Sequence, residues 1–210
     1  MKKIAVIDYG MSNLHSVLKS FQKVINKNYY LSIAQSSKDI EDASVLVLPG
    51  QGAACSCVEK LSSDFPDLKN QILNKPFLGI CLGFQILFEK SYENDGVNCF
   101  SLINGDVKDF RGVIHKDMKV PHMGWNKVKQ KYDHILWRSI PDESFFYFVH
   151  SYYAQANIES CVFSSTNYQV DFTTSILKDN MLACQFHPEK SSKYGLQFLS
   201  NFINWTEELK

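Results

Sequence analysis

The chain has 210 residues, of which 45% are hydrophobic and 13% aromatic, and this is enough for a single domain with a buried core. Its 22 basic and 22 acidic residues give a formal net charge of zero, so no basic excess is present to bind a nucleic-acid backbone. No apolar run approaches the roughly eighteen residues of a membrane helix, and the apolar run between Lys3 and Asp8 is too short for the core of a signal peptide. We therefore expect one cytoplasmic domain, residues 1–210, that binds neither nucleic acid nor membrane.

The first half of the chain predicts strands that alternate with helices. Its apolar runs lack polar alternation, which is typical of parallel strands that are covered on both faces. The predicted strands are 3–10, 31–36, 43–53 and 76–81. Helices are predicted over 12–25, with Ser12 as N-cap, over 55–61 and 67–74, and from residue 82 through Phe88.

The second half predicts strands with short connections, over 105–110, 125–130, 145–154 and 173–188, and a closing amphipathic helix over 195–209. Together the two halves predict an α/β fold with a mostly parallel central sheet and an antiparallel extension. In open sheets of this kind, ligands bind at the carboxyl ends of the strands. The relevant tips here are residues 8–13, 49–52, 81 and 187.

One of these tips carries a cysteine between two glycines, in the pentapeptide GICLG at residues 79–83. A nucleophile on a sharp strand-to-helix turn needs small neighbours two residues away on each side. The following helix would favour the thiolate of Cys81, and the backbone N–H of Leu82 could face a developing oxyanion. A buried cysteine whose flanking glycines serve only helix–strand packing explains the pentapeptide equally well.

A nucleophilic cysteine needs a base, and the base needs a group that orients it. His187 and Glu189 lie two residues apart at the end of the last predicted strand, so in an extended chain their side chains point the same way. The PGQG turn at residues 49–52 could supply a second backbone donor to an oxyanion. His150, in an aromatic strand, fits either a core or a rim position.

The six cysteines show no metal-binding spacing, since the only close pair, Cys55 and Cys57, has no second pair to complete a zinc site. We therefore expect no metal and no cofactor, and packing roles for most of the other cysteines.

Taken together, these stretches resemble the class I, triad-type glutamine amidotransferases. The marks of the resemblance are the GICLG elbow, Gln85 four residues after the cysteine, and the late HPE triplet. Within that family the chain is most similar to the glutaminase subunits of imidazole glycerol phosphate synthases. IDYGMSNLHSV, VLPGQGA, VPHMGWNKV, YFVHSYYA and QFHPEKSSKYGLQFLSNF follow one another in the order found there.

The resemblance implies a three-layer α/β/α, flavodoxin-like fold and a catalytic triad of Cys81, His187 and Glu189. Cys81 would form a glutamyl thioester, and His187, oriented by Glu189, would protonate the leaving ammonia and then activate water. The implied oxyanion hole consists of Leu82 and the peptide between Gly50 and Gln51. The implied glutamine-binding residues are Gly52, Gln85, Glu93, Ser151 and Tyr152.

The resemblance also implies a heterodimer with a cyclase subunit that is a (β/α)₈ barrel. The ammonia would pass through an internal channel to that subunit, which makes imidazole glycerol phosphate and an aminoimidazole carboxamide ribotide for histidine biosynthesis. Such a barrel needs about 250 residues, so we expect it to be another polypeptide. The residues expected near it are Asn13, His122, Gly124, Trp125 and Asn126.

The chain departs from the family pattern at Ser12, Gln51, Phe84 and the segment GVNCF at 96–100. These departures leave open a paralogous glutaminase that supplies ammonia to a different barrel, for example one that amidinates a sugar derivative. Two further alternatives are a different cysteine hydrolase on a similar elbow, and a non-catalytic module. The departures touch none of Cys81, His187 and Glu189.

Overall fold

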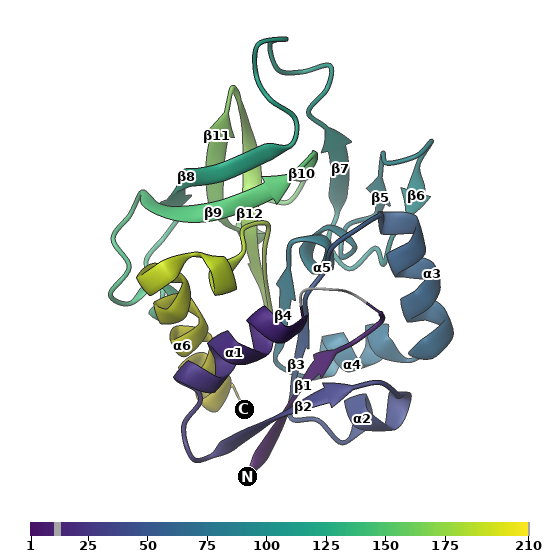
Figure 1. Ribbon diagram of the computed structural model, residues 1–210, viewed down its shortest axis with the longest axis vertical. Coiled ribbons are helices and arrows are strands. Elements are labelled where there is room, and N and C mark those ends of the chain that lie inside the picture. The colour runs from purple at the N-terminus through teal and green to yellow at the C-terminus, as the bar shows by residue number, and fades with distance from the viewer. Residues whose placement is uncertain (11–13, 210) are drawn as a thin grey trace.

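The computed structural model describes residues 1–10 and 14–209, and Figure 1 shows a large central sheet with helices on both faces. The parallel part of the sheet has the spatial order β2–β1–β3–β4–β13, and each of these neighbours is parallel to the next. The bounds of these strands are Lys2–Ile7 (β1), Tyr29–Ala34 (β2), Val45–Leu48 (β3), Phe77–Ile80 (β4) and Met181–Cys184 (β13). The order confirms the predicted parallel sheet.

The central strands are buried on both faces, as their continuous apolar sequences predict. All four residues of β3 are buried, and Val45 and Val47 point to one face while Leu46 and Leu48 point to the other. Each face therefore has its own hydrophobic core, and each core needs a layer of helices to cover it.

Two helices, α1 (Leu14–Val24) and α6 (Ser192–Glu208), cover one face and meet through an edge-to-face contact between Phe21 and Phe202. The opposite face is covered by further helices, which lie on the other side of the sheet in Figure 1. They are α2 (Ser37–Glu41), α3 (Ala54–Asp64), α4 (Leu68–Asn74) and α5 (Leu82–Gln85). This arrangement is the three-layer α/β/α fold that the family resemblance implied.

Beyond β13 the sheet continues as a mostly antiparallel extension in the order β12–β10–β7–β5–β6, and β11, β8 and β9 branch from β12. The bounds are Lys90–Ser91 (β5), Val97–Asn98 (β6), Gly105–Asp109 (β7), His122–Gln130 (β8), Ser144–His150 (β9), Tyr152–Ala156 (β10), Val162–Tyr168 (β11) and Val170–Lys178 (β12). Three 3₁₀ turns span Ile135–Trp137 (η1), Glu159–Cys161 (η2) and Pro188–Lys190 (η3). The predicted antiparallel extension is confirmed.

Three predicted elements differ from the structure. The segment 173–188, expected in the antiparallel extension, forms the two strands β12 and β13, and β13 joins the parallel sheet beside β4. The strand expected over 145–154 is broken at Ser151, because β9 pairs with β8 whereas β10 pairs with β7 and β12. The helix expected from residue 82 through Phe88 ends at Gln85. Its run of apolar residues is buried all round, and the next carbonyls accept hydrogen bonds from residues 100–103 instead of from a further helical turn.

Within the described residues, no helix is long and apolar enough to cross a membrane. The predicted cap Ser12 lies outside those residues.

Candidate active site

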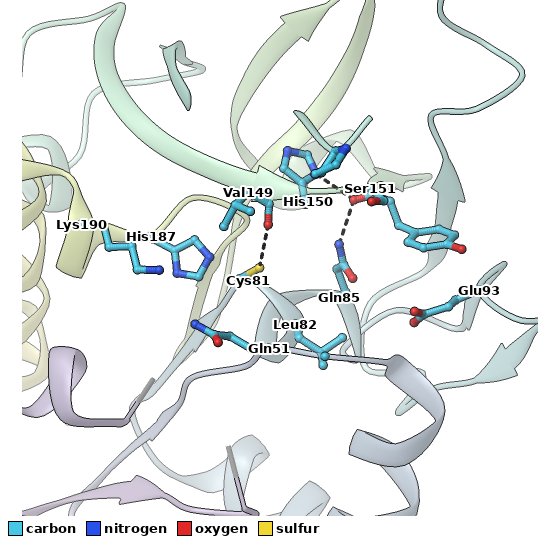
Figure 2. Close-up of a pocket in the computed structure, with 13 residues that line it drawn as sticks. Gln51, Cys81, Leu82, Gln85, Glu93, Val149, His150, Ser151, His187 and Lys190 are labelled. Carbon is cyan, nitrogen blue, oxygen red and sulfur yellow. Dashed lines mark hydrogen bonds between the residues drawn. The ribbon is translucent and has the colours of Figure 1, made fainter. Parts of the chain in front are cut away.

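Cys81 lies immediately after β4, at the carboxyl edge of the parallel sheet, and its backbone adopts a left-handed φ of +55°. Side chains other than glycine rarely adopt such a φ, so the surrounding structure must hold it in place. The residue opens onto a cavity of about 410 Å³. Figure 2 shows its sulfur in this cavity beside the His187 ring. This is the predicted elbow, and it places the thiol at the rim of the sheet.

The glycines around Cys81 are required by close backbone approaches. A methyl group on Gly79 would lie 2.6 Å from the carbonyl oxygen of Gly83. A methyl group on Gly83 would collide with the carbonyl oxygen of Leu48 at the end of β3. A methyl group on Gly50 would lie 2.6 Å from the backbone nitrogen of Gly83. The elbow and the tip of β3 are therefore packed backbone against backbone, which brings the PGQG turn next to Cys81.

His187 follows β13, the strand beside β4, and only 1% of its surface is exposed. Its Nδ1 lies 2.8 Å from Oε1 of Glu189. Burial alone would lower the pKa of His187, but the charges and hydrogen bonds that Cys81 and Glu189 offer outweigh it and raise that pKa to about 10. His187 therefore holds a proton at neutral pH, between a sulfur and a carboxylate.

The contact between His187 and Glu189 confirms the predicted pairing but not its predicted cause. The chain is not extended between them, since Pro188 begins the 3₁₀ turn η3. Ser191 stabilises this turn, because its hydroxyl donates to the carbonyl of His187 over 2.6 Å and accepts from the backbone N–H of Tyr147 over 2.9 Å. The turn and the neighbouring strand β9 together fix the ring.

Two groups besides His187 lie close to the Cys81 sulfur. The Nε2 amide of Gln185 lies 3.6 Å from Sγ as a donor, and the carbonyl of Val149 lies 4.0 Å away as an acceptor. Gln185 is fully buried, and its Oε1 accepts a hydrogen bond of 2.9 Å from Nε2 of Gln85. Oriented polar groups therefore lie beside the sulfur, unlike the apolar surroundings of a cysteine that serves packing alone.

The residues predicted to bind glutamine lie on the walls of the same cavity, namely Gly52, Gln85, Glu93, Ser151 and Tyr152. The side-chain amide of Gln85 donates a hydrogen bond of 2.9 Å to the carbonyl of Tyr152. Oε2 of Glu93 accepts the backbone N–H of Ala54 at 2.6 Å, so this carboxylate also caps the beginning of α3. From the predicted oxyanion hole, Gln51 and Leu82 line the cavity as well, and Gly50 packs against the elbow.

The class I glutamine amidotransferase family model matches residues 5–205 of the chain.

The chain belongs to this glutamine amidotransferase family.

Relatives with the name imidazole glycerol phosphate synthase subunit HisH match over almost the whole chain. The protein from Hydrogenovibrio crunogenus is 42% identical over 206 residues, which cover 97% of each chain. HisH 1 of Pseudomonas aeruginosa is 44% identical over 210 residues and 98% of each chain. Among solved structures, a glutamine amidotransferase of Thermotoga maritima superposes with a TM-score of 0.61 at 17% identity, covering 99% of this chain and 84% of that one. At that identity the likeness supports the glutamine amidotransferase fold alone.

In this glutamine amidotransferase, the residues expected near a partner fall into three groups. Asn13 lies outside the described residues. Trp125 is 52% exposed on the outer face of β8, and Gly124 and Asn126 are half-buried on its inner face. His122 is only 3% exposed, so its side chain lies below the surface on which a partner would dock. The alternation of β8 turns it inward, against the rings of Phe148 and Tyr168.

Among the residues around the site that were not predicted from the sequence, four have polar side chains. His150, left open between core and rim, is 6% exposed and lines the cavity, as does Lys190. Gln185 and Ser191 were overlooked, although both lie within four residues of His187 in the stretch QFHPEKS. A buried strand that ends in a polar residue was the available signal for Gln185. In the described part of the chain, no group of three or more His, Cys, Asp or Glu residues could hold a metal ion.

Proposed function

We propose that this chain is the glutaminase subunit of an imidazole glycerol phosphate synthase, which hydrolyses glutamine and delivers the ammonia to a cyclase in histidine biosynthesis. The observation that carries the proposal is the pairing of a strained cysteine elbow with the 2.8 Å contact between His187 and Glu189 in one cavity of about 410 Å³. Relatives that bear this subunit name at 42–44% identity over nearly the full length support the choice of pathway.

The catalytic roles follow from the protonation of His187. The Cys81 sulfur, as a thiolate, attacks the side-chain carbonyl carbon of glutamine and forms a tetrahedral intermediate. His187 gives its proton to the departing nitrogen, so the C–N bond breaks and ammonia and a glutamyl thioester result. The neutral ring then takes a proton from water, the hydroxide attacks the thioester, and glutamate leaves as the thiolate is regenerated. Glu189 keeps the ring in the orientation that both steps need.

The remaining cavity residues serve binding and charge stabilisation. The backbone N–H of Leu82 and the peptide between Gly50 and Gln51 stabilise the oxyanion of the intermediate. Glutamine is held by Gly52, Gln85, Glu93 and the backbone at Ser151 and Tyr152. The negative carboxylate of Glu93 attracts the positive α-ammonium group of the glutamine. These assignments rest on the positions of the residues around one cavity.

The partner is a cyclase with a (β/α)₈ barrel that docks on the outer face of β8 and β9. Met123, Trp125 and Phe145 are each half or more exposed on this face and form an apolar surface, which favours a protein partner. Val149, on the same strand as Phe145, lines the cavity, so a protein on this face lies beside the place where ammonia is released. A docked partner would shield the released ammonia from water, so the ammonia would stay unprotonated and therefore nucleophilic.

The deciding experiment measures glutamate release from glutamine with and without a histidine-pathway cyclase and its ribonucleotide substrate. We expect strong stimulation by the complete partner, and loss of release in Cys81→Ala to the background level. Cys55→Ala, at a partly exposed position of α3, is the matched control and should retain the wild-type rate.

Each other outcome has a distinct meaning. Release that depends on Cys81 but is not stimulated would contradict the histidine pathway and favour another ammonia acceptor. Release that persists in Cys81→Ala would contradict the nucleophile. No release under any condition would contradict the proposed glutaminase activity itself.

A further inference from the structure

A hydrogen-bonded chain, buried at its two histidines, connects strand β8 with the wall of the cavity. The Nδ2 amide of Asn126 lies 3.2 Å from Nε2 of His122. Nδ1 of His122 lies 2.8 Å from Nε2 of His150, and Nδ1 of His150 lies 2.8 Å from the carbonyl oxygen of Tyr152. Figure 2 shows the last of these bonds, above the cavity that contains Cys81. None of these contacts is needed by the chemistry proposed above.

The direction of every bond in this chain follows from its two ends. The carbonyl of Tyr152 only accepts, so Nδ1 of His150 carries a hydrogen, and in a neutral ring its Nε2 must accept. Nδ1 of His122 must then donate, which leaves its Nε2 to accept from the Asn126 amide. The orientation of that amide is itself determined, because Oδ1 of Asn126 accepts the backbone N–H of Lys127 at 2.8 Å.

The surroundings of the two histidines keep both rings neutral. His122 lies between the rings of Phe148 and Tyr168, at centroid distances of 4.9 and 4.1 Å, and Phe110 lies 5.3 Å from His150. Burial lowers the pKa of His122 to about 4. Burial, together with the nearby positive charges of His122 and His187 when they are protonated, lowers the pKa of His150 to about 3. A single tautomer is therefore fixed for each ring at neutral pH.

The chain does not end at Tyr152. The same carbonyl accepts a hydrogen bond of 2.9 Å from Nε2 of Gln85. This amide also donates a hydrogen bond of 2.9 Å to Oε1 of Gln185. Gln185 in turn donates to the Cys81 sulfur at 3.6 Å. Gln85 is thus oriented by two acceptors, one of which is a carbonyl that His150 holds. Freeing the peptide of Tyr152 would loosen both the backbone wall of the site and the Gln85 side chain.

We propose that His150 is a positioning residue for the glutamine site: its Nδ1–H holds the carbonyl of Tyr152, and through it Gln85, in the orientation that substrate binding requires. His122 assists by fixing the tautomer of His150. The proposal rests on the proposed function, because glutamine is the substrate whose binding it addresses. Its action is on ground-state binding, so the KM for glutamine should respond more than kcat.

Two substitutions distinguish the roles of the two ring nitrogens of His150, because each retains one of the two hydrogen bonds. The amide nitrogen of Asn reaches the place of Nδ1, so His150→Asn retains the donor to Tyr152 and loses the contact with His122. The amide of Gln reaches the place of Nε2, so His150→Gln retains the contact with His122 and loses the donor to Tyr152. We expect His150→Gln to raise the KM for glutamine about tenfold, the value of one buried hydrogen bond, with a smaller change in kcat. We expect His150→Asn to stay within about threefold of the wild-type KM.

His15→Asn and His15→Gln, at an exposed position of α1, are the matched controls and should leave KM unchanged. An equal KM increase in both His150 variants, or none in either, would overturn the positioning role while leaving the glutaminase intact.

A second measurement decides the histidine pair without any turnover. Side-chain ¹⁵N and ¹H NMR of the resting protein should show His122 and His150 both protonated at Nδ1 only, without change from pH 5 to pH 8. In His122→Phe, which keeps a stacked ring but removes the donor, the His150 signals should move. A proton on Nε2 of either wild-type ring would overturn the proposal. A wild type that shows these tautomers but releases no glutamate with its partner would instead contradict the proposed function.

Discussion

At the scale of single residues, the environment of His187 determines how the site handles its proton. The ring is buried, which disfavours the charged form, yet Cys81 and Glu189 raise its pKa to about 10. The ring consequently holds its proton throughout the physiological pH range, and in the proposed reaction this proton goes to the leaving nitrogen. Glu189 contributes a negative charge and also a hydrogen-bond acceptor that orients the His187 ring, and the two contributions can be tested separately.

Replacing Glu189 with Gln keeps the shape and removes the charge. We expect Glu189→Gln to lower the pKa of His187 and to reduce kcat for glutamine by about 10²- to 10⁴-fold, as for other triads that lose their orienting carboxylate. The rate should then also decline at a lower pH than in the wild type. Steady-state kinetics between pH 6 and pH 10 check both effects. The exposed Glu208→Gln on α6 is the control, and a similar loss of rate in it would contradict the assigned role.

The residues that could be predicted are those whose partners are close in sequence. His187 and Glu189 are two positions apart, and Cys81 is marked by its flanking glycines. The pair of His122 and His150 could not be predicted, because 28 residues separate them and only the antiparallel register of β8 and β9 places them opposite each other. The same register turns the His122 side chain inward, away from the outer face of β8.

At the scale of elements, the elbow depends on how closely two strand tips approach. The turn after β4 lies directly against the end of β3, with no side chain between Gly83 and Leu48. Only glycine fits there, because any Cβ would collide with a carbonyl oxygen of the backbone, which cannot rotate away. The position of Cys81 relative to the PGQG turn is therefore determined by backbone packing rather than by side-chain contacts.

Gly83→Ala tests this packing. We expect it to lower the free energy of unfolding by about 1–3 kcal/mol, the usual cost of overpacking a tight core site, and to impair glutamine hydrolysis. Urea unfolding monitored by circular dichroism gives the first quantity through the transition midpoint. Ser62→Ala, exposed on α3, should leave the midpoint unchanged. A Gly83→Ala protein as stable as the wild type would show that the two tips can separate.

Two kinds of element were predictable from the sequence. One is a helix that buries a single face, as α6 does, and the other is a short strand that is buried completely, as β3 is. The prediction was wrong where an apolar run is buried on every side. The segment after Cys81 has no polar face, so periodicity could not show that α5 ends after one turn and that the next carbonyls accept hydrogen bonds from residues 100–103.

At the scale of the whole molecule, the buried histidines make stability depend on pH. His122 and His150 have folded pKa values of about 4 and about 3, against 6.5 without perturbation. As the pH falls below 6.5, the unfolded chain takes up protons that the folded chain does not, so the free energy of unfolding decreases. His187 has the opposite sign: its stabilisation is complete below 6.5 and is lost as the pH rises towards about 10.

We expect the stability of the wild type to fall between pH 6 and pH 4.5, and His150→Asn to show a slope smaller by up to about 1.4 kcal/mol per pH unit, the contribution of one proton. Urea titrations at several pH values measure this slope. His15→Asn, exposed in the folded chain, should retain the wild-type slope. Equal slopes for wild type and His150→Asn would indicate that His150 protonates freely in the folded state.

The two faces of strand β8 limit where residues can be inserted or deleted in this chain. Its inner face carries His122 and Asn126 towards the site, and its outer face carries Met123 and Trp125 towards the expected partner. Inserting or deleting one residue within 122–130 would exchange the two faces beyond that point, whereas a change of two residues would preserve them. Length variation should therefore gather in the connections at 110–121 and 131–143, outside the strand.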